Sequence, residues 1–252
     1  VFKSDEGQIQ VYGPQIVVEA EHAFTSAILQ VTGTRQKRIY FLTGHGEHSI
    51  QNDYSKARGG LKDNLFLVGE LDLLNGFGIP QDAAALVIPG PNKDLDNREI
   101  KLLNEYLEKD GKLLILLNPD PSESWKQLLS EWRIDVPAGT LIDPASHVAP
   151  NLDHPLVPRN QNRFGFTEVY FAGAAGLIPQ KGLPESVKIQ PLAWTSRKSW
   201  IEKDFTSGEE PQFDKLKDQP GPFAIGALIH KGGTNIVVFG DSDFATDKHF
   251  YN

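Results

Sequence analysis

Seven polar side chains follow short apolar segments at positions where they could bind a ligand or move a proton. Histidine, aspartate and glutamate can act as acids and bases, and asparagine can hydrogen-bond a ligand. The seven residues are His45, Glu47, Asn92, Asn118, Asp120, Asp241 and Asp243. They lie in four turn-forming tetrads, which begin at Gly44, Pro89, Asn118 and Gly240. Ligands of open parallel sheets bind outside the carboxyl ends of the strands, so we predict that these residues line one rim.

The plain alternative for each tetrad is structural. Gly, Pro, Asn and Asp are common wherever strands end, because they make turns and cap helices. For any single tetrad this interpretation is the better supported of the two. The prediction of a rim therefore depends on all four tetrads meeting at one edge of a sheet.

The segment His45–His48 is the part of the predicted rim that could bind a metal ion. With Asp241 and Asp243 added, the donors would be rich in oxygen, which suits magnesium or calcium. Such a site would support the first alternative function, a metal-dependent hydrolase. However, Gly46 predicts a loop, and the helical spacing of zinc-protease histidines is absent. We therefore favour the interpretation in which Glu47 forms a cap or salt bridge and His48 is solvated, and we assign no metal ligand.

The sequence contains none of the common enzyme signatures. It has no Gly-x-Ser-x-Gly elbow, no P-loop and no Gly-x-Gly-x-x-Gly fingerprint. It also has no cysteine, which excludes disulfides, thiolate metal sites and cysteine nucleophiles. We assign no catalytic residue and no cofactor, and we expect that the protein is not an enzyme.

Four tryptophans indicate a second alternative function. Trp125 and Trp132 fall on the apolar face of a predicted helix, so we place them in the core. Trp194 and Trp200 lie in a less regular part of the chain, where they could stack on sugar rings. A carbohydrate-binding module is therefore the second alternative.

Composition restricts the class of partner. The 252 residues carry 25 Lys and Arg against 33 Asp and Glu, which gives a net charge of −8. This charge repels a phosphate backbone, so we expect no nucleic-acid partner. Hydrophobic residues make up 39% of the chain, which is sufficient for one large globular domain. The longest apolar runs are shorter than the roughly 20 residues that a membrane helix needs.

Alternating strands and helices are predicted to position the rim. Apolar strands are expected over 38–42, 84–88 and 112–117, with helices over 55–65, between Asp96 and Gly111, and over 122–132. Asp96 and Glu99 have the spacing of a capping box. Strand–helix–strand units require parallel pairing with helices on both faces. The predicted fold class is therefore α/β, a three-layer αβα sandwich of the flavodoxin or amidotransferase type.

The sequence pattern of the first 34 residues, and that of the second half of the chain, differ from the regular strand–helix pattern. Residues 1–34 are expected to be a lead-in segment, the remnant of a preceding domain or a linker, with a helical stretch over 21–31. Residues 35–252 are expected to form the α/β domain. Within its second half we predict a surface excursion over 143–165, strands over 169–178 and 187–194, a polar loop over 195–218, and a hairpin over 223–239 that makes the mostly parallel sheet mixed.

Several segments together resemble one family. They are Ile39–Glu47, Ala84–Pro91, Tyr106–Leu114, Thr195–Glu202 and Gly240–Ala245. The most specific parts are the motifs Thr-Gly-His-Gly-Glu and Gly-Asp-Ser-Asp-Phe-Ala. The sequence is similar to the GldG-like auxiliary component of ABC-type transport systems, known from bacterial gliding motility, over roughly residues 18–250. A related α/β domain occurs in an intraflagellar-transport subunit.

The resemblance implies a location and partners. It implies a non-catalytic scaffold or binding domain in the periplasm, part of a bacterial protein anchored by membrane helices that lie outside these residues. It implies an ABC permease and an ATPase as partners. The family resembles glutamine amidotransferases in its layering but lacks their nucleophilic cysteine, in agreement with this sequence. A saccharide or a peptide is the candidate ligand of the rim.

Overall fold

A computed structural model describes residues 2–3, 9–10, 36–76, 78–163, 168–206 and 210–249. The first two short pieces, β1 (Phe2–Lys3) and β2 (Ile9–Gln10), pair antiparallel. The helical stretch predicted over 21–31 lies outside the described residues. The division of the chain near residue 34 therefore stays a prediction.

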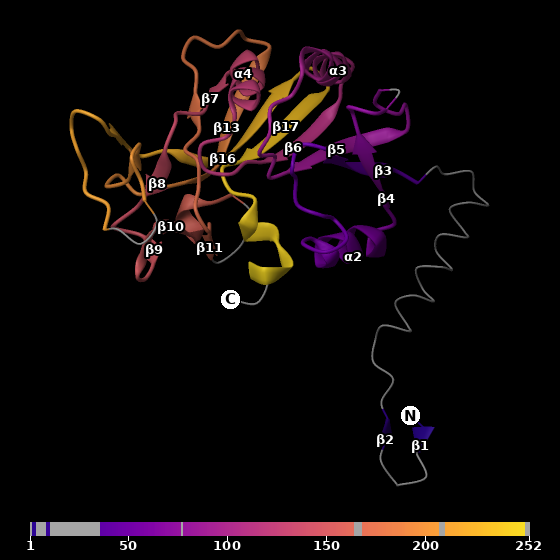
Figure 1. Ribbon diagram of the computed structural model, residues 1–252, viewed down its shortest axis with the longest axis horizontal. Coiled ribbons are helices and arrows are strands. Elements are labelled where there is room, and N and C mark those ends of the chain that lie inside the picture. The colour runs from indigo at the N-terminus through magenta and orange to yellow at the C-terminus, as the bar shows by residue number, and fades with distance from the viewer. Residues whose placement is uncertain are drawn as a thin grey trace.

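A mixed sheet of seven strands forms the centre of the molecule (Figure 1). Its strands are β3 (Arg38–Thr43), β4 (Leu67–Asp72), β5 (Ala83–Pro89), β6 (Lys112–Leu116), β13 (Val187–Trp194), β16 (Ala224–Lys231) and β17 (Thr234–Phe239). The strand order is β13-β16-β17-β6-β5-β3-β4. The five strands from β17 to β4 are parallel. β16 runs antiparallel to them, and β13, which pairs antiparallel with β16, again runs in their direction. The predicted hairpin, β16 and β17, is confirmed.

Helices lie on both faces of this sheet. Those described are α2 (Ser55–Asp63), α3 (Asn97–Glu108) and α4 (Glu123–Glu131). Figure 1 shows α3 and α4 on one face and α2 on the other. The predicted capping box starts α3, since the Asp96 side chain accepts the Glu99 amide (2.8 Å) and the Glu99 side chain accepts the Asp96 amide (2.9 Å).

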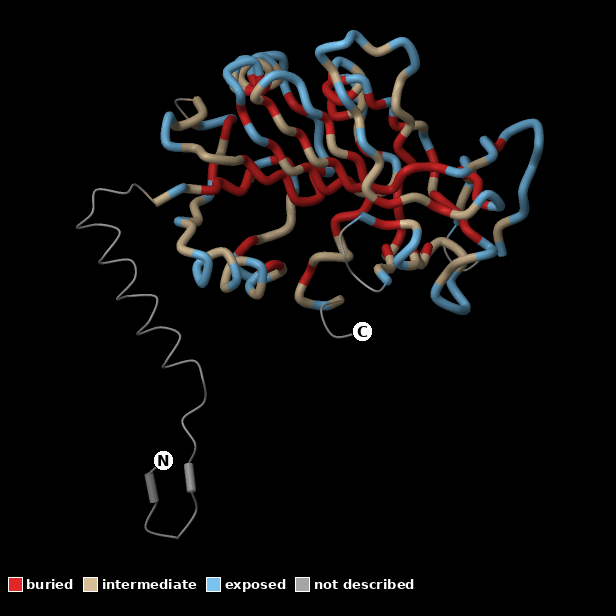
Figure 2. The backbone as a smooth tube through the Cα atoms, turned by 180° about the vertical axis from the view of Figure 1, so that it is seen from behind, coloured by how far each residue is buried: buried red, intermediate tan, exposed pale blue. Residues whose placement is uncertain are grey.

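Each face of the sheet has its own apolar core. Alternate strand residues such as Leu42 and Ile88 pack with Leu103 of α3 and Trp125 of α4. Their neighbours, such as Phe41, point to the opposite core with Tyr54 and residues from the second half of the chain. Figure 2 shows this buried centre between exposed loops. The assignment of Trp125 and Trp132 to the core is confirmed.

Short strands and turns cover the rest of the second face and the end of the sheet. They are β7 (Ile134–Asp135), β8 (Thr140–Ile142), β9 (His147–Val148), β10 (Asn151–Pro158), β11 (Glu168–Tyr170), β12 (Ile178–Pro179), β14 (Trp200–Glu202) and β15 (Gln219–Pro220), with 3-10 turns η1 (Arg159–Gln161), η2 (Asp243–Ala245) and η3 (Asp247–His249). They form small antiparallel sheets in the orders β11-β10-β9, β15-β14-β8 and β12-β7. The predicted surface excursion therefore contains β9 and β10, which pair with each other. The predicted polar loop contains β14, which pairs with β8 and β15.

The single strand predicted over 169–178 is wrong. Only its ends, β11 and β12, are strands, and the apolar residues between them form a buried connection. Its backbone groups bond to partners from separate elements: the Ala172 amide to Asp241, the Ala174 carbonyl to Leu141 and the Ala175 amide to Gly240. Because these partners lie on no common strand, no ladder forms. The connection is closely packed at Gly176, since a Cβ there would lie 2.8 Å from Ile201 Cδ1.

The architecture confirms the broader fold prediction. A mixed, largely parallel sheet with helices on both faces is an α/β fold. The second face carries α2 together with small sheets instead of a full helical layer. The finer assignment to a flavodoxin- or amidotransferase-like three-layer sandwich stays a prediction.

Candidate functional site

The four predicted tetrads meet at one edge of the sheet. Backbone hydrogen bonds join neighbouring corners: His48 N to Pro89 O (2.8 Å), Gly90 N to Leu116 O (2.7 Å) and Leu117 N to Phe239 O (2.8 Å). These bonds follow from parallel strands in adjacent positions, whose carboxyl ends share an edge. The prediction that the tetrads gather along a common rim is confirmed.

The first group of polar residues at this edge is the His45 cluster, made of His45, Glu47 and Glu99. His45 Nε2 lies 3.0 Å from Glu99 Oε2, and His45 Nδ1 lies 3.4 Å from Glu47 Oε1. The His45 side chain is 2% exposed and both carboxylates are 1% exposed. The His45 amide also donates to Glu47 (2.7 Å). The imidazole therefore lies between two buried carboxylates, with the edge of Trp125 beside it.

The charges around His45 favour its protonated form. Its contact with Glu47 raises the pKa of His45, burial opposes the rise, and Glu99 adds to it. A protonated imidazole leaves the cluster with one net negative charge, whereas a neutral one would leave two carboxylates unbalanced in a buried place. Glu99 is at the same time the capping residue of α3. The cluster thus ties the loop after β3 to the start of α3.

The second group is the His48 cluster, made of His48, Asn118, Ser242 and Asp243. His48 Nε2 lies 3.1 Å from Ser242 Oγ and 3.3 Å from Asp243 Oδ1. Ser242 Oγ donates to Asn118 Oδ1 (2.5 Å), and Asn118 Nδ2 donates to the Gly90 carbonyl (3.3 Å). The His48 side chain is 30% exposed. These bonds connect the corners after β3, β5, β6 and β17.

The serine of the His48 cluster looks at first like a nucleophile. A histidine lies beside its hydroxyl, and His48 Nδ1 lies 3.8 Å from Asp53 Oδ2, which resembles the order of a catalytic triad. However, Ser242 is fully buried and its proton is donated to Asn118 instead of to His48. The carboxylate of Asp243 raises the pKa of His48, which favours the protonated imidazole, a form that cannot act as a base. The hydroxyl is therefore an internal link between loops.

Asp241 is buried next to this cluster. Its carboxylate accepts the amides of Ala172 (2.6 Å) and Asp243 (2.7 Å). Burial raises the pKa of Asp241 to about 7, in spite of these two hydrogen bonds. The side chain fixes the connection between β11 and β12 to the turn after β17, and it does not face solvent.

The two remaining predicted residues lie at the margins. Asn92 Nδ2 donates to the Gly46 carbonyl (3.3 Å), so it braces the loop of the His45 cluster. Asp120 is exposed and pairs with Lys126 of α4 (2.8 Å). Asp120 is thus separate from both clusters, and its role in ligand binding stays a prediction.

Three residues that contribute to the two clusters were not predicted from the sequence. Glu99 was predicted as a helix cap, but nothing in the pattern links it to His45, which lies 54 residues earlier. Ser242 stands inside the predicted Gly240 tetrad, where its hydroxyl was not singled out. Tyr54 donates its hydroxyl to the Ser242 carbonyl and also packs edge-on against His48. His48 was interpreted as solvated, and its bonds to Ser242 and Asp243 correct this.

The geometry bears directly on the metal alternative. In the described part of the chain, no group of three or more His, Asp or Glu residues is arranged to hold a metal ion. His45 and Glu47 face each other inside one cluster, while Asp243 belongs to the other and Asp241 is buried next to it. The donor set proposed for magnesium or calcium is therefore not brought together.

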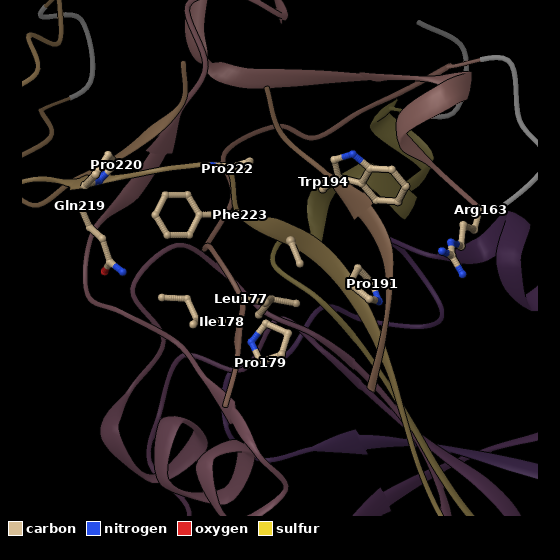
Figure 3. A pocket seen from close by; sticks show the side chains of 11 residues that line it. Arg163, Leu177, Ile178, Pro179, Pro191, Trp194, Gln219, Pro220, Pro222 and Phe223 are labelled. Atoms are coloured by element: carbon tan, nitrogen blue, oxygen red, sulfur yellow. The ribbon is translucent and has the colours of Figure 1, made fainter. Parts of the chain in front are cut away.

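A separate pocket of about 490 Å³ lies where β13 ends and β16 begins (Figure 3). Trp194 and Ala224 are partners in the β13–β16 ladder, and the Leu177 amide donates to the Ala224 carbonyl (2.8 Å). The pocket is lined by Arg163, Leu177, Ile178, Pro179, Pro191, Trp194, Gln219, Pro220, Pro222, Phe223 and Ala224. None of the seven predicted site residues lines it.

The pocket separates the two tryptophans that were predicted to stack on sugars. Trp194 forms part of the wall and is partly exposed. Trp200 is 7% exposed, donates to Glu202 (3.2 Å) and packs edge-on against Phe213. A platform built from both rings is therefore wrong, and only Trp194 is available to a ligand.

Comparisons with known proteins agree with the sequence resemblance. The family described as "ABC-type uncharacterized transport system", an auxiliary family, matches residues 36–251. Among solved structures, one titled "mmIFT52 N-terminal domain" matches with a TM-score of 0.60 and 16% identity, over 84% of this chain and 89% of that one. At this identity the likeness shows a shared fold alone. No curated protein matches.

No helix among the described residues has the length and apolar character to cross a membrane.

Proposed function

This chain belongs to the auxiliary family of ABC-type transport systems, and we propose that it serves there as a non-catalytic scaffold or binding domain outside the cytoplasm. The resemblance to GldG-like components suggests a system of the gliding-motility type. In this proposal the domain holds subunits or cargo in place while a separate ATPase supplies energy. It is carried by membrane helices outside these residues.

One observation carries the non-catalytic part of the proposal. The hydroxyl of Ser242, which lies next to a histidine, is fully buried and donates to Asn118. A nucleophile must reach its substrate and lose its proton to a base, and this hydroxyl is arranged for neither. The neighbouring carboxylates are likewise occupied: Glu99 by His45 and a helix cap, and Asp241 by two backbone amides. These contacts support a stabilising role for the rim.

Co-purification tests the proposed partners. The full-length, membrane-anchored protein, tagged and extracted in mild detergent, should bring down an ABC permease and an ATPase. Asp120→Asn is a matched control, because Asp120 is exposed and separate from both clusters. Repeated purification of the wild type without either subunit would refute the transport role.

The proposed location has its own test, because the chain has no cysteine. Lys101→Cys places one thiol at a position whose side chain is 77% exposed. A membrane-impermeant maleimide should label it in cells with a permeabilised outer membrane and an intact inner membrane. Ser124→Cys, at a position that is 7% exposed, should react only after denaturation. Labelling of Lys101→Cys only after the inner membrane is broken would place the domain in the cytoplasm.

A further inference from the structure

We propose that the pocket at the end of β13 (Figure 3) binds an extended peptide segment. The segment is rich in apolar residues and proline and carries a carboxylate. The proposed function enters this inference only at one point: it identifies a partner subunit as the source of the segment. The recognition chemistry itself follows from the residues of the pocket.

The lining is apolar and poor in hydrogen-bonding groups. Of the lining residues, Leu177, Phe223 and Ala224 are buried, and Ile178, Pro179 and Pro191 are partly exposed. Its volume, about 490 Å³, is in the range of binding pockets for small ligands and short segments. Burying the apolar side chains of a ligand on this surface is the main favourable contribution to binding.

Aromatic and proline rings shape the walls. Figure 3 shows Phe223 and Trp194 on opposite sides of the pocket, with Pro222 between them. Grooves of this kind, lined by aromatic rings, bind proline-rich segments, whose extended helix is already formed before binding and loses little conformational entropy. The indole Nε1 of Trp194 has no hydrogen-bond partner among the described residues, so it is free to donate to a peptide carbonyl.

One positively charged side chain, that of Arg163, lies at the margin of the pocket. Arg163 lies beyond Trp194, is exposed, and forms no ion pair with any carboxylate in the described part of the chain. An unpaired guanidinium next to apolar walls is complementary to a ligand whose apolar residues are followed by a carboxylate. This complementarity fixes both the charge of the ligand and its direction along the pocket.

The main sheet offers backbone bonds beside the same pocket. β13 is the terminal strand and pairs with β16 on one side only. On its outer side, the described residues supply one bridge, Asn162 to Ala193, and one bond, Arg163 N to Leu192 O (2.7 Å). At the start of the strand, the Val187 amide donates to the Pro184 carbonyl (2.9 Å). The outer edge of 188–190 is therefore available to an extended chain that continues out of the pocket.

These features favour a peptide over a saccharide. Sugar hydroxyls need several polar side chains, and here the polar lining groups are Arg163, Gln219 and the Trp194 indole. The four prolines of the lining have no amide hydrogen to donate. A saccharide would thus lose hydrogen bonds to water without replacing them, whereas an apolar peptide would not.

The direct test measures peptide binding to the isolated chain. The probe is a blocked heptapeptide, Pro-Leu-Pro-Pro-Leu-Pro-Glu, compared with the same peptide ending in Gln, by titration calorimetry. We expect the Glu peptide to bind about threefold more tightly than the Gln peptide. Arg163→Gln should remove this preference, whereas Arg197→Gln, which changes an exposed arginine outside the pocket, should keep it.

Trp194 provides an independent readout. It is partly exposed, whereas Trp125, Trp132 and Trp200 are buried, so the peptide should protect its fluorescence from acrylamide quenching. Trp194→Ala should weaken binding by about tenfold, and Trp194→Phe should retain most of it without the fluorescence change. Trp194→Phe keeps the proposal testable if the alanine variant fails to fold.

Several outcomes would overturn the proposal. These are no binding of either peptide at millimolar concentration, binding that Arg163→Gln and Trp194→Phe both leave unchanged, binding of maltotriose instead of peptide, or dimerisation of the chain that Trp194→Ala abolishes. If the full-length Arg163→Gln/Trp194→Phe variant still brings down the permease and ATPase while peptides do not bind, the pocket assignment fails and the proposed function stands. Peptide binding without co-purified subunits would instead support the pocket assignment and refute the transport role.

Discussion

The His45 and His48 clusters each place a histidine beside a carboxylate at the same edge of one sheet, but solvent reaches only one of them. The His45 side chain is 2% exposed, and its two carboxylate partners are as deeply buried. The His48 side chain is 30% exposed, and its partner Asp243 is 44% exposed. Each histidine has carboxylates that raise its pKa. The two clusters therefore differ in dielectric surroundings more than in chemistry.

This difference shows how burial sets the role of an ion pair. In the His45 cluster, water cannot replace a lost partner, so each charge depends on the others. In the His48 cluster, water screens the charges, and the neutral bonds of Ser242 and Asn118 hold the loops together. We conclude that the first cluster contributes mainly to stability through charge, and the second through its hydrogen bonds and close packing.

The largest expected effect comes from removing the charge of His45. His45→Gln leaves Glu47 and Glu99 buried without a cation, and we expect it to lower the free energy of unfolding by about 3 to 5 kcal/mol at neutral pH. His48→Gln, the matched change in the exposed cluster, should lower it by less than about 1 kcal/mol. Urea denaturation of both variants measures the difference.

A double variant sharpens this comparison. Adding Glu47→Gln to His45→Gln leaves one buried carboxylate instead of two, so it should recover part of the lost stability. Equal losses for His45→Gln and His48→Gln would contradict the distinction between the clusters. A further loss in the double variant would show that Glu47 acts by its hydrogen bond to the His45 amide instead of by charge.

The second prediction concerns the packing that supports the His48 cluster. A Cβ on Gly240 would lie 2.0 Å from the Ala175 carbonyl oxygen, a backbone atom that cannot move aside alone. We expect Gly240→Ala to destabilise the protein by about 2 to 3 kcal/mol, measured as a lower urea midpoint. Gly59→Ala is the matched control, because no atom lies within 4 Å of its Cβ position in α2.

The control should change stability in the opposite direction. Alanine is favoured over glycine inside a helix by about 0.5 to 1 kcal/mol, so Gly59→Ala should stabilise slightly. Unchanged stability in Gly240→Ala would mean that the turn after β17 does not pack against the β11–β12 connection as described.

The third prediction is a fall in stability as pH rises. Carboxylates raise the pKa of His45 and of His48 above the ordinary value of about 6.5, and burial raises that of Asp241 to about 7. All three groups bind a proton more tightly in the folded state. Their stabilising effect is present at low pH and is lost as pH rises through the folded pKa. From pH 6 to pH 9 we expect a loss of about 1 to 3 kcal/mol in urea titrations.

The same titration separates the contributing groups. Asp241→Asn should flatten the fall, and His48→Gln should change it little because solvent screens that pair. His48 also lowers the pKa of Asp243, whose contribution is lost only as pH falls below the usual range of aspartate. Stability that increases from pH 6 to pH 9 would contradict the assigned directions.

The regular half of the molecule was predictable from sequence for a physical reason. Short apolar strands ended by turn residues, with a capping box at Asp96, specify parallel units whose carboxyl ends must share an edge. From this the rim followed without coordinates. Its interpretation as a ligand site did not follow, because the pattern places residues at an edge but does not say whether they face each other or solvent.

The irregular half and the details of the site depend on contacts between distant residues. The segment between β11 and β12 is apolar like a strand, yet its backbone bonds go to Asp241, Leu141 and Gly240. The bond from Tyr54 to the Ser242 carbonyl joins residues 188 positions apart. The pocket at Trp194 combines residues from separate segments of the second half of the chain. No local period encodes such pairings, so only coordinates reveal them.

The smallest expected effect tests the margin of the rim. Asp120 pairs with Lys126 on the surface and touches neither cluster, so Asp120→Asn should change the free energy of unfolding by less than about 0.5 kcal/mol. The backbone at Asp120 has a positive φ of 49°, which asparagine adopts as readily as aspartate, so the variant adds no strain. A change above about 1 kcal/mol, or one that also altered the pH dependence attributed to His45 and Asp241, would show that this corner is coupled to the clusters. Such a result would join Asp120 to the clusters and weaken the division of the edge into one buried and one partly exposed cluster.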